Sequence, residues 1–377
     1  MKQFKQFTVG VIGCGMISPC YFRNLCDGDD KRFKIVKVKG CSDIKPERAK
    51  QRAEEFGILQ MTNEEILNDP EIDIVLNLTN HTSHVEVIEA ALKAGKHVYS
   101  EKMIAPTFAE GKYLYDLAKE KGLMLCAAPD TFLGSSMQTA RRLYDAGLIG
   151  EAVAGNAIMV RGYHHERFRT DPERRFAFCH GGGIIFDMGC YYFASLINIL
   201  GPIKTVSGFS QTRGANERVY MHPDQPHYGE IMKIESPNNT AAILEFESGA
   251  LVTLTSTSES VSEHYFMIHG TEGQLKLPDC NTYTGDVEMK LKTGDFMPMP
   301  KNFMFTEDCR GLGLADMCYA MLNGRAPRAS GEMALHMLEA ADAITNQKGN
   351  YKMTTTCTRP APFAQGITEY PEMALDL

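Results

Sequence analysis

Short apolar segments alternate with amphipathic ones along the first third of the chain. The apolar segments have the length and composition of buried strands, and they lie at 8–12, 33–41, 74–78, 96–100 and 123–127. Between them, apolar residues recur at helical spacing, most clearly at 46–56, 84–94 and 108–121. Strands that alternate with helices predict an α/β fold built on a doubly wound parallel sheet.

After residue 128 the pattern changes to closely spaced strands. Two pairs of β-rich segments each flank a short polar turn, which predicts hairpins at 243–247 with 250–255 and at 264–269 with 273–277. Because hairpins join antiparallel strands, we expect an α+β domain with a largely antiparallel open sheet. Helical spacing returns at 136–146, 313–322 and 331–345. The sequence therefore predicts two domains, 1–128 and 129–377.

Length, charge and cysteine usage narrow the class of protein. The chain has 377 residues, more than one ordinary core accommodates. Its 39 basic and 47 acidic residues give a net charge of −8 without a basic stripe, which argues against nucleic acid and anionic membrane as partners. No apolar run reaches the roughly 20 residues that span a bilayer, and the amino terminus lacks the apolar core of a signal peptide. Eleven scattered cysteines without a Cys-x-x-Cys pair are typical of reduced thiols, so we expect a cytoplasmic protein.

The turn at 13–18, with the sequence Gly-Cys-Gly-Met-Ile-Ser, follows the first predicted strand and opens a helix. This is the context of a dinucleotide-binding fingerprint. Gly13 would permit the tight turn, and Gly15 would let the backbone approach a pyrophosphate at the helix amino terminus. Met16 and Ile17 would line the same site. The alternative is a tight turn that binds no ligand.

Asp43 ends the second predicted strand, where a carboxylate can accept hydrogen bonds from a ribose 2′-hydroxyl. The same charge repels a 2′-phosphate, so Asp43 favours NAD as the cofactor. Lys45 and Arg48 lie nearby and leave NADP open. Asp43 could also be an ordinary turn residue.

Polar residues follow two further strands of the predicted sheet. Glu101 and Lys102 come directly after a buried strand, at the sheet edge where ligands bind in doubly wound folds. Thr79, Asn80 and His84 follow the preceding strand and could contact the cofactor. The alternative for this second group is that its members only cap a helix. Lys102 is positioned to deliver a cation to the nicotinamide.

The glycine run 181–183 leads into a second candidate site. Three glycines would allow a close approach of backbone to ligand. Asp187 and Tyr191 follow at a spacing of four, which places a carboxylate and a phenol on one face of a helix. A tyrosine needs a neighbouring cation to act as a base near neutral pH, and Lys102 could be that cation. The alternative is that these residues belong to an aromatic core.

A polar, ring-rich loop precedes the glycine run. Adjacent histidines rarely bind one ion, and neither a His-x₃-His nor a Cys-x₂-Cys spacing occurs near them, so we predict no metal site. His164, His165 and Arg169 are instead interpreted as groups that bind substrate hydroxyls.

These motifs together resemble the glucose–fructose oxidoreductase/inositol dehydrogenase (Gfo/Idh/MocA) family. The resemblance covers nearly the whole chain. It implies a Rossmann domain and a carboxy-terminal α/β domain that often forms a dimer or tetramer interface, so a homo-oligomer is expected. It also implies NAD(P)-dependent oxidation or reduction of sugars, polyols and related hydroxy compounds. The segments 128–134 and 310–317 are similar to those of a bacterial subgroup that acts on carbohydrates or glycosides.

The chain departs from the family pattern at several positions. Met103 replaces the proline of the Glu-Lys-Pro motif, whose Lys-Pro bond is often cis; a cis bond before a residue other than proline costs about 3–4 kcal/mol, which leaves the placement of the lysine open. Asn80 and His81 replace proline and asparagine of a Thr-Pro-Asn-x-x-His run. Tyr191 stands where many members have histidine, although some members also use tyrosine there.

The leading hypothesis is an NAD-dependent dehydrogenase that acts on a secondary hydroxyl of a sugar, polyol or glycoside, such as a glycoside 3-dehydrogenase. Tyr191 would accept the hydroxyl proton as a phenolate stabilised by Lys102, and Asp187 would orient the substrate. A second hypothesis is a lyase, glycosidase or isomerase that keeps NAD bound and oxidises its substrate transiently. A third is a non-catalytic sensor of NAD or sugar.

Overall fold

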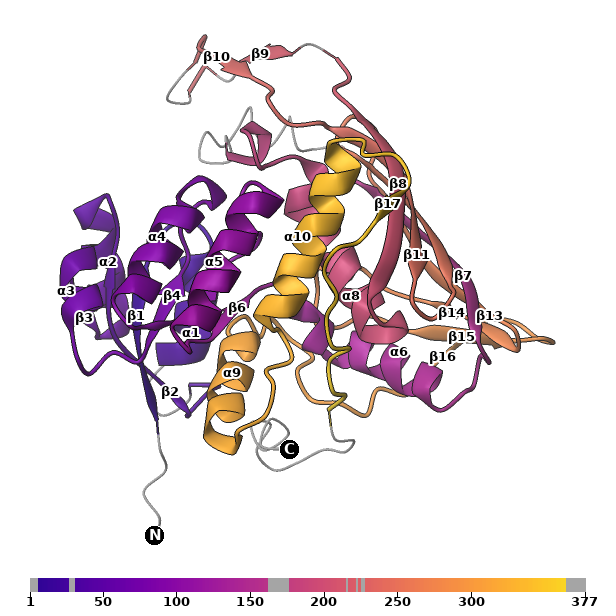
Figure 1. Cartoon of the computed structure of the whole chain (residues 1–377), viewed down its shortest axis with the longest axis horizontal. Helices are drawn as coiled ribbons and strands as arrows, with labels where there is room; N and C mark the ends of the chain where they lie inside the picture. Colours follow the sequence, from indigo (N-terminus) through magenta and orange to yellow (C-terminus); the bar gives the residue numbers. More distant parts are fainter. Residues whose placement is uncertain are drawn as a thin grey trace.

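The computed structural model describes residues 6–26, 31–161, 176–214, 216–221, 223–224 and 228–363. Figure 1 shows two β-sheets with helices packed on them, the first in indigo and the second mainly in orange. Helix α10 (Gly331–Thr345), drawn in yellow, contacts α5 (Phe108–Glu120) of the first unit and β8 (Ile203–Gln211) of the second. The two units are therefore joined by packed secondary structure as well as by the chain.

The first sheet is parallel, with strand order β3-β2-β1-β4-β5-β6. Its central strands are almost fully buried, which explains why they read as continuous apolar runs. Its strands are β1 (Phe7–Ile12), β2 (Val36–Ser42), β3 (Leu59–Gln60), β4 (Ile74–Asn77), β5 (His97–Ser100) and β6 (Leu125–Ala127). The helices of this unit are α1 (Ser18–Cys26), α2 (Pro46–Phe56), α3 (Asn63–Asn68), α4 (His81–Lys93) and α5 (Phe108–Glu120).

The second sheet has nine strands in the order β16-β15-β14-β13-β7-β12-β11-β8-β17. Its pairs are antiparallel except β7 with β12. The strands are β7 (Ala152–Val160), β8 (Ile203–Gln211), β11 (Asn239–Phe246), β12 (Leu251–Thr257), β13 (Glu263–Gly270), β14 (Gly273–Lys276), β15 (Glu288–Leu291), β16 (Met297–Pro298) and β17 (Tyr351–Lys352).

Burial alternates along β11 and β12, so this sheet has one packed and one exposed face. Helices lie on one side of it in Figure 1. They are α6 (Ser135–Asp145), α8 (Cys190–Leu200) and α10, with α9 (Leu312–Asn323) beyond the end of the sheet. A small sheet of β9 (Glu217–Val219) and β10 (Ile231–Lys233) extends from it, and a 3₁₀ turn covers Thr131–Leu133.

The predicted fold class is confirmed, with local differences such as the second strand, which begins at Val36 and not at residue 33. Helix α4 begins at His81, three residues before the predicted start, because polar residues fill a first turn that carries no apolar periodicity. Strand β3 and helix α3 were not predicted. They have two and six residues respectively, which is too short to show a periodic apolar pattern. A capping box between Thr62 and Glu65 was the available signal for α3. Within the described residues, no helix combines the length and the hydropathy needed to cross a membrane.

Candidate active site

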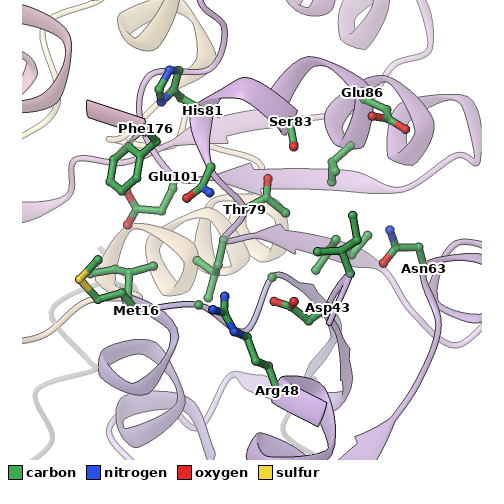
Figure 2. A pocket seen from close by; sticks show the side chains of 18 of the residues that line it. Met16, Asp43, Arg48, Asn63, Thr79, His81, Ser83, Glu86, Glu101 and Phe176 are labelled. Atoms are coloured by element: carbon green, nitrogen blue, oxygen red, sulfur yellow. The ribbon is translucent and has the colours of Figure 1, made fainter. Parts of the chain in front are cut away.

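A cavity of about 730 Å³ lies at the carboxyl ends of β1, β2, β4 and β5. This edge includes the point where the strand order reverses between β1 and β4, the usual ligand position in doubly wound sheets. Residues 176–191 of the second unit close one end of the cavity. Figure 2 shows side chains from both units converging on it. The volume is that of a typical cofactor or small-molecule site.

The glycine turn after β1 has the features that a dinucleotide requires. Gly13 has a φ of +105°, and a Cβ there would lie 2.6 Å from the carbonyl carbon of Leu78, so only glycine fits. A Cβ on Gly15 would meet no atom within 4 Å. The protein itself therefore does not require the second glycine, and the open space beside it suits a pyrophosphate. Met16 and Ile17 also line the cavity, as predicted.

Asp43 makes the contacts of a turn residue and also lines the cavity. Its Oδ2 accepts a hydrogen bond from the backbone N–H of Cys14 at 2.7 Å, and its Oδ1 accepts one from Lys45 N–H at 2.8 Å. It thereby fixes the glycine turn relative to the end of β2. The carboxylate also lines the cavity beside Arg48, so it remains positioned to meet a ribose (Figure 2).

The residues after β4 divide into a cavity wall and a support behind it. Thr79 and Asn80 line the cavity, and Thr79 Oγ1 donates to Asn77 Oδ1 at 2.7 Å. His84 was predicted to contact the cofactor, but it is not among the residues that line the cavity. Its ring is buried, with nitrogens 2.6 Å from the carbonyl oxygen of Met103 and 3.0 Å from that of Thr79. His84 therefore joins the turns that follow β4 and β5.

Lys102 reaches across from the first unit to the second. Its Nζ donates to Asp187 Oδ1 at 2.7 Å and to the Asp187 carbonyl oxygen at 2.9 Å. The Lys102–Met103 peptide bond is cis, as is Ala128–Pro129. Burial alone would lower the pKa of Lys102, but the negative charge of Asp187 opposes it, and this pKa lies well above its usual value. Lys102 is thus a fixed cation in the site.

A π-helical turn at Ile185–Gly189 presents Asp187 to this lysine. Turns of this kind interrupt regular helical hydrogen bonding and are frequent at functional sites. Here the Asp187 carbonyl oxygen accepts from Lys102 Nζ in addition to Oδ1, so two oxygens of one residue hold the ammonium. The turn runs directly into α8, which carries Tyr191.

Tyr191 lies beneath Lys102, with Nζ 5.4 Å from the centre of its ring. Burial raises the pKa of Tyr191 above its ordinary value of 10, and the positive charge of Lys102 opposes this shift without cancelling it. The prediction that Lys102 makes Tyr191 a phenolate near neutral pH is therefore wrong for the protein alone. The reason is desolvation, which disfavours the anion more than one cation favours it.

Glu101 shares this wall of the cavity. Its Oε1 accepts a hydrogen bond from the Tyr21 hydroxyl at 2.7 Å, and its Oε2 accepts one from the Lys102 backbone N–H at 3.2 Å. The carboxylate is largely buried but still lines the cavity. Glu101 therefore fixes the backbone from which Lys102 extends.

The glycine run 181–183 was predicted to allow close approach of a ligand, but close packing within the protein also requires glycine there. A Cβ on any of its members would lie less than 3 Å from protein atoms, and two of them have positive φ. Ligand approach is therefore not needed to explain these glycines, although two of them also border the cavity. The nearest atoms are Pro106 Cβ for Gly181, Phe176 O for Gly182 and Pro237 O for Gly183.

Several cavity residues were not predicted. Asn63 comes from the unpredicted helix α3, and Glu86 from the second turn of α4. Phe176 and His81 meet across the two units with ring centres 5.9 Å apart. The predicted hydroxyl-binding residues His164, His165 and Arg169 lie outside the described residues.

Comparison with known families agrees with this architecture. The Gfo/Idh/MocA profile described as an oxidoreductase family with an NAD-binding Rossmann fold matches residues 7–128. The Gfo/Idh/MocA C-terminal domain matches residues 137–276. The chain belongs to the Gfo/Idh/MocA oxidoreductase family. The matched Rossmann domain of this Gfo/Idh/MocA protein is of the NAD-binding type, and its glycine turn and Asp43 both line the cavity.

Curated relatives of this Gfo/Idh/MocA protein are distant. An uncharacterised oxidoreductase of Schizosaccharomyces pombe is 32% identical over 146 residues, which are 38% of either chain. Levoglucosan dehydrogenase of Pseudarthrobacter phenanthrenivorans is 24% identical over 63% of this chain and 64% of that enzyme. The chain thus matches less than two thirds of the length of these two proteins. The NAD⁺-dependent scyllo-inositol 2-dehydrogenase of Bacillus subtilis is 26% identical over 92% of this chain and 95% of that enzyme.

Solved structures share the fold over nearly the whole chain. Levoglucosan dehydrogenase in complex with NADH and levoglucosan aligns with a TM-score of 0.74 at 19% identity, over 91% of this chain and 97% of that one. The aldose–aldose oxidoreductase of Caulobacter crescentus aligns with a TM-score of 0.74 at 21% identity, over 93% of this chain and 100% of that one. These likenesses show that the chain shares its fold with these proteins.

Proposed function

We propose that this protein uses NAD to oxidise or reduce a secondary alcohol position of a sugar, polyol or glycoside. The observation that carries the proposal is the Lys102–Asp187 pair, 2.7 Å apart, beside Tyr191 at the end of the cavity that the second unit closes. These three groups can bind a hydroxyl, move its proton and stabilise charge on its oxygen. Relatives named for inositol and levoglucosan support a cyclic polyol or sugar as the substrate class.

Each side chain has a separate role in this proposal. NAD held at the glycine turn and Asp43 would supply the hydride acceptor or donor. Tyr191 exchanges a proton with the substrate oxygen, and the ammonium of Lys102 stabilises the negative charge that develops on that oxygen. Asp187 holds Lys102 through two oxygens and leaves its carboxylate beside the substrate. Arg169, His164 and His165 remain our candidates for binding the other hydroxyls.

The function is tested by NADH formation from NAD⁺ with a panel of cyclic polyols, free sugars and glycosides that includes scyllo-inositol and levoglucosan. The Lys102→Ala variant should reduce kcat by about 10²–10⁴-fold, because Lys102 acts on charge that develops only in the transition state. Lys112→Ala is a suitable control, since Lys112 pairs with Asp116 on the exposed surface of α5. A rise in KM with unchanged kcat would contradict the assignment.

The panel also separates the two alternatives. A lyase, glycosidase or isomerase with retained NAD would consume a glycoside without releasing NADH. A sensor would bind NAD⁺ or sugar without turnover of any compound. The hypothesis of retained NAD needs a bound cofactor that survives purification, so the first check is whether denaturation of the purified protein releases NAD⁺ or NADH.

A further inference from the structure

His81 is a cavity residue that the proposed reaction does not yet use. It is the first residue of α4, its side chain is only 8% exposed, and it lines the cavity near Lys102 and Asp187. Its Nε2 lies 3.1 Å from the carbonyl oxygen of His180. A carbonyl oxygen can only accept, so Nε2 carries the hydrogen and Nδ1 is left with a lone pair.

The charge state of the ring agrees with this tautomer. Burial lowers the pKa of His81 to about 4, against a smaller opposing effect of the His180 carbonyl. The ring is therefore neutral at neutral pH, and Nδ1 can accept a hydrogen bond. Among the described residues, Nδ1 has no hydrogen-bond partner. Nδ1 is not among the fully buried polar atoms that lack a partner, so this acceptor is accessible to a ligand or to solvent in the cavity.

The second unit fixes the orientation of the ring. His180 anchors Nε2, and Phe176 packs edge-on against the imidazole at 5.9 Å between centres. Figure 2 shows His81 and Phe176 at the same end of the cavity as Glu101. The charges of Asp187 and Lys102 both act on the ring. His81 is thus held at the reaction end of the cavity, away from the end where Asp43 and Arg48 lie.

We propose that His81 is a reactant-binding residue whose Nδ1 accepts a hydrogen bond from a donor on a bound reactant. The donor is the amide N–H of nicotinamide or a hydroxyl of the sugar, the two N–H or O–H sources that the proposed function brings to this end of the cavity. The inference rests on that function. Through Nε2 the histidine contacts the second unit, and through Nδ1 it still presents an acceptor to the cavity. The family pattern has asparagine at this position, and its shorter side chain cannot do both through the same contacts.

The first arm of the test compares NAD⁺ with 3-acetylpyridine adenine dinucleotide, in which a methyl group replaces the amide nitrogen. Affinities are measured by calorimetry for the full chain, His81→Leu and His81→Asn. Leucine keeps apolar packing against Phe176 but removes the acceptor. Asparagine keeps an oxygen two bonds from Cβ, where histidine has Nδ1. If the amide is the donor, the wild type should prefer NAD⁺ by roughly 5–10-fold, leucine should abolish that preference and asparagine should retain part of it.

The second arm measures kcat and KM with scyllo-inositol or whichever compound of the panel is oxidised. If a sugar hydroxyl is the donor, His81→Leu should raise KM by roughly 5–10-fold without changing the preference between the two dinucleotides. His97→Leu is the control, because its ring accepts from Met124 N–H at the opposite end of β5. Thermal unfolding of each variant reports folding separately.

The outcomes distinguish the inference from the function on which it rests. Loss of dinucleotide preference in His81→Leu supports the inference and assigns the amide, whereas a rise in KM alone supports it and assigns the hydroxyl. A folded His81→Leu variant that matches the wild type in both arms overturns the inference and leaves the proposed function intact. Failure of the wild type to bind NAD⁺ or to turn over any compound overturns both.

Discussion

Lys102 Nζ contacts two oxygens of Asp187, the carboxylate at 2.7 Å and the backbone carbonyl at 2.9 Å. The lysine belongs to the turn after β5, and the aspartate belongs to a π-helical turn more than 80 residues later. One ammonium therefore joins the dinucleotide-binding unit to the unit that closes the cavity. The Lys102 ammonium therefore comes from the turn after a strand of the parallel sheet, while Asp187 of the second unit fixes its position.

Asp187→Asn should impair the chemical step more than substrate binding. The amide keeps a hydrogen-bond acceptor for Lys102 but loses the charge that opposes burial, so the pKa of Lys102 falls. We expect kcat to decrease by about 10–10²-fold, with a smaller change in KM. Steady-state kinetics at several pH values check this. Equal kinetics in Asp187→Asn and the wild type would show that the carboxylate charge is dispensable.

The rate of alcohol oxidation should rise with pH. Tyr191 must lose its proton before it can accept one from the substrate, and burial holds its pKa above 10 despite Lys102. The active, deprotonated fraction therefore increases through the whole range from pH 6 to 10, by up to about tenfold per unit. Carbonyl reduction uses the protonated phenol and should fall only at the alkaline end. Glu101 and Cys190 raise this pKa further, and Arg310 lowers it.

Initial rates in both directions test this dependence, with Tyr191→Phe as the matched variant. Phenylalanine removes the titrating hydroxyl and keeps the aromatic packing, so the slope with pH should disappear together with most of the activity. An oxidation rate that levels off by pH 7 in the wild type would mean that a group with an ordinary or lowered pKa accepts the proton.

Alanine at Gly13 should affect the stability of the protein, whereas alanine at Gly15 should affect its affinity for NAD⁺. Gly13→Ala forces a side chain onto Leu78 at a φ of +105°, so it should lower the free energy of unfolding by about 1–3 kcal/mol without any cofactor present. Gly15→Ala meets no protein atom within 4 Å, so unfolding should change little. Its methyl group would instead occupy the space that suits the pyrophosphate, and Kd for NAD⁺ should rise at least about tenfold. Thermal unfolding and calorimetry on both variants separate the two effects.

Asp43→Asn should shift cofactor preference toward NADP. Removal of the carboxylate charge removes its repulsion of a 2′-phosphate, and Arg48 at the same end of the cavity favours that group. We expect the ratio of kcat/KM for NADP⁺ to that for NAD⁺ to rise about tenfold or more. A modest loss of stability should accompany it, because the neutral side chain accepts more weakly from Cys14 and Lys45. An unchanged ratio would limit Asp43 to its structural contacts.

The sequence predicted the elements better than the contacts between them. Apolar periodicity placed α2 and α10 at the observed bounds, and motif spacing placed Gly15 and Lys102 at the cavity. Three other features follow from tertiary packing, which leaves no local pattern. They are the contact of His81 with the second unit, the buried position of His84 and the close packing that requires glycine at 181–183.

The titration of Tyr191 was the point at which sequence reasoning failed most clearly. A neighbouring cation can be inferred from a motif, because spacing and topology bring Lys102 near the phenol. The amount of solvent around the phenol cannot be inferred from a motif, because it depends on every segment that covers α8. Desolvation was therefore omitted from the prediction although it dominates the result.

Self-association is expected through the exposed face of the nine-stranded sheet. Phe209 is 77% exposed, while Ile243 and Leu251 are each 51% exposed. Phe209 pairs with Ala241, two residues from Ile243, and Ile243 pairs with Thr253, two residues from Leu251, so all three side chains lie on one face. An apolar patch of this kind on a monomer marks an interaction site.

Light scattering after size exclusion should therefore give a mass of at least twice the 41.9 kDa of one chain. Phe209→Asp should shift the protein toward the monomer, because association would bury a charge without a partner. Lys112→Asp is a control away from this sheet, since Lys112 pairs with Asp116 at the surface of α5. A wild-type mass of one chain at micromolar concentration would contradict the prediction. A dimer that Phe209→Asp leaves intact would place the interface on another face of the molecule.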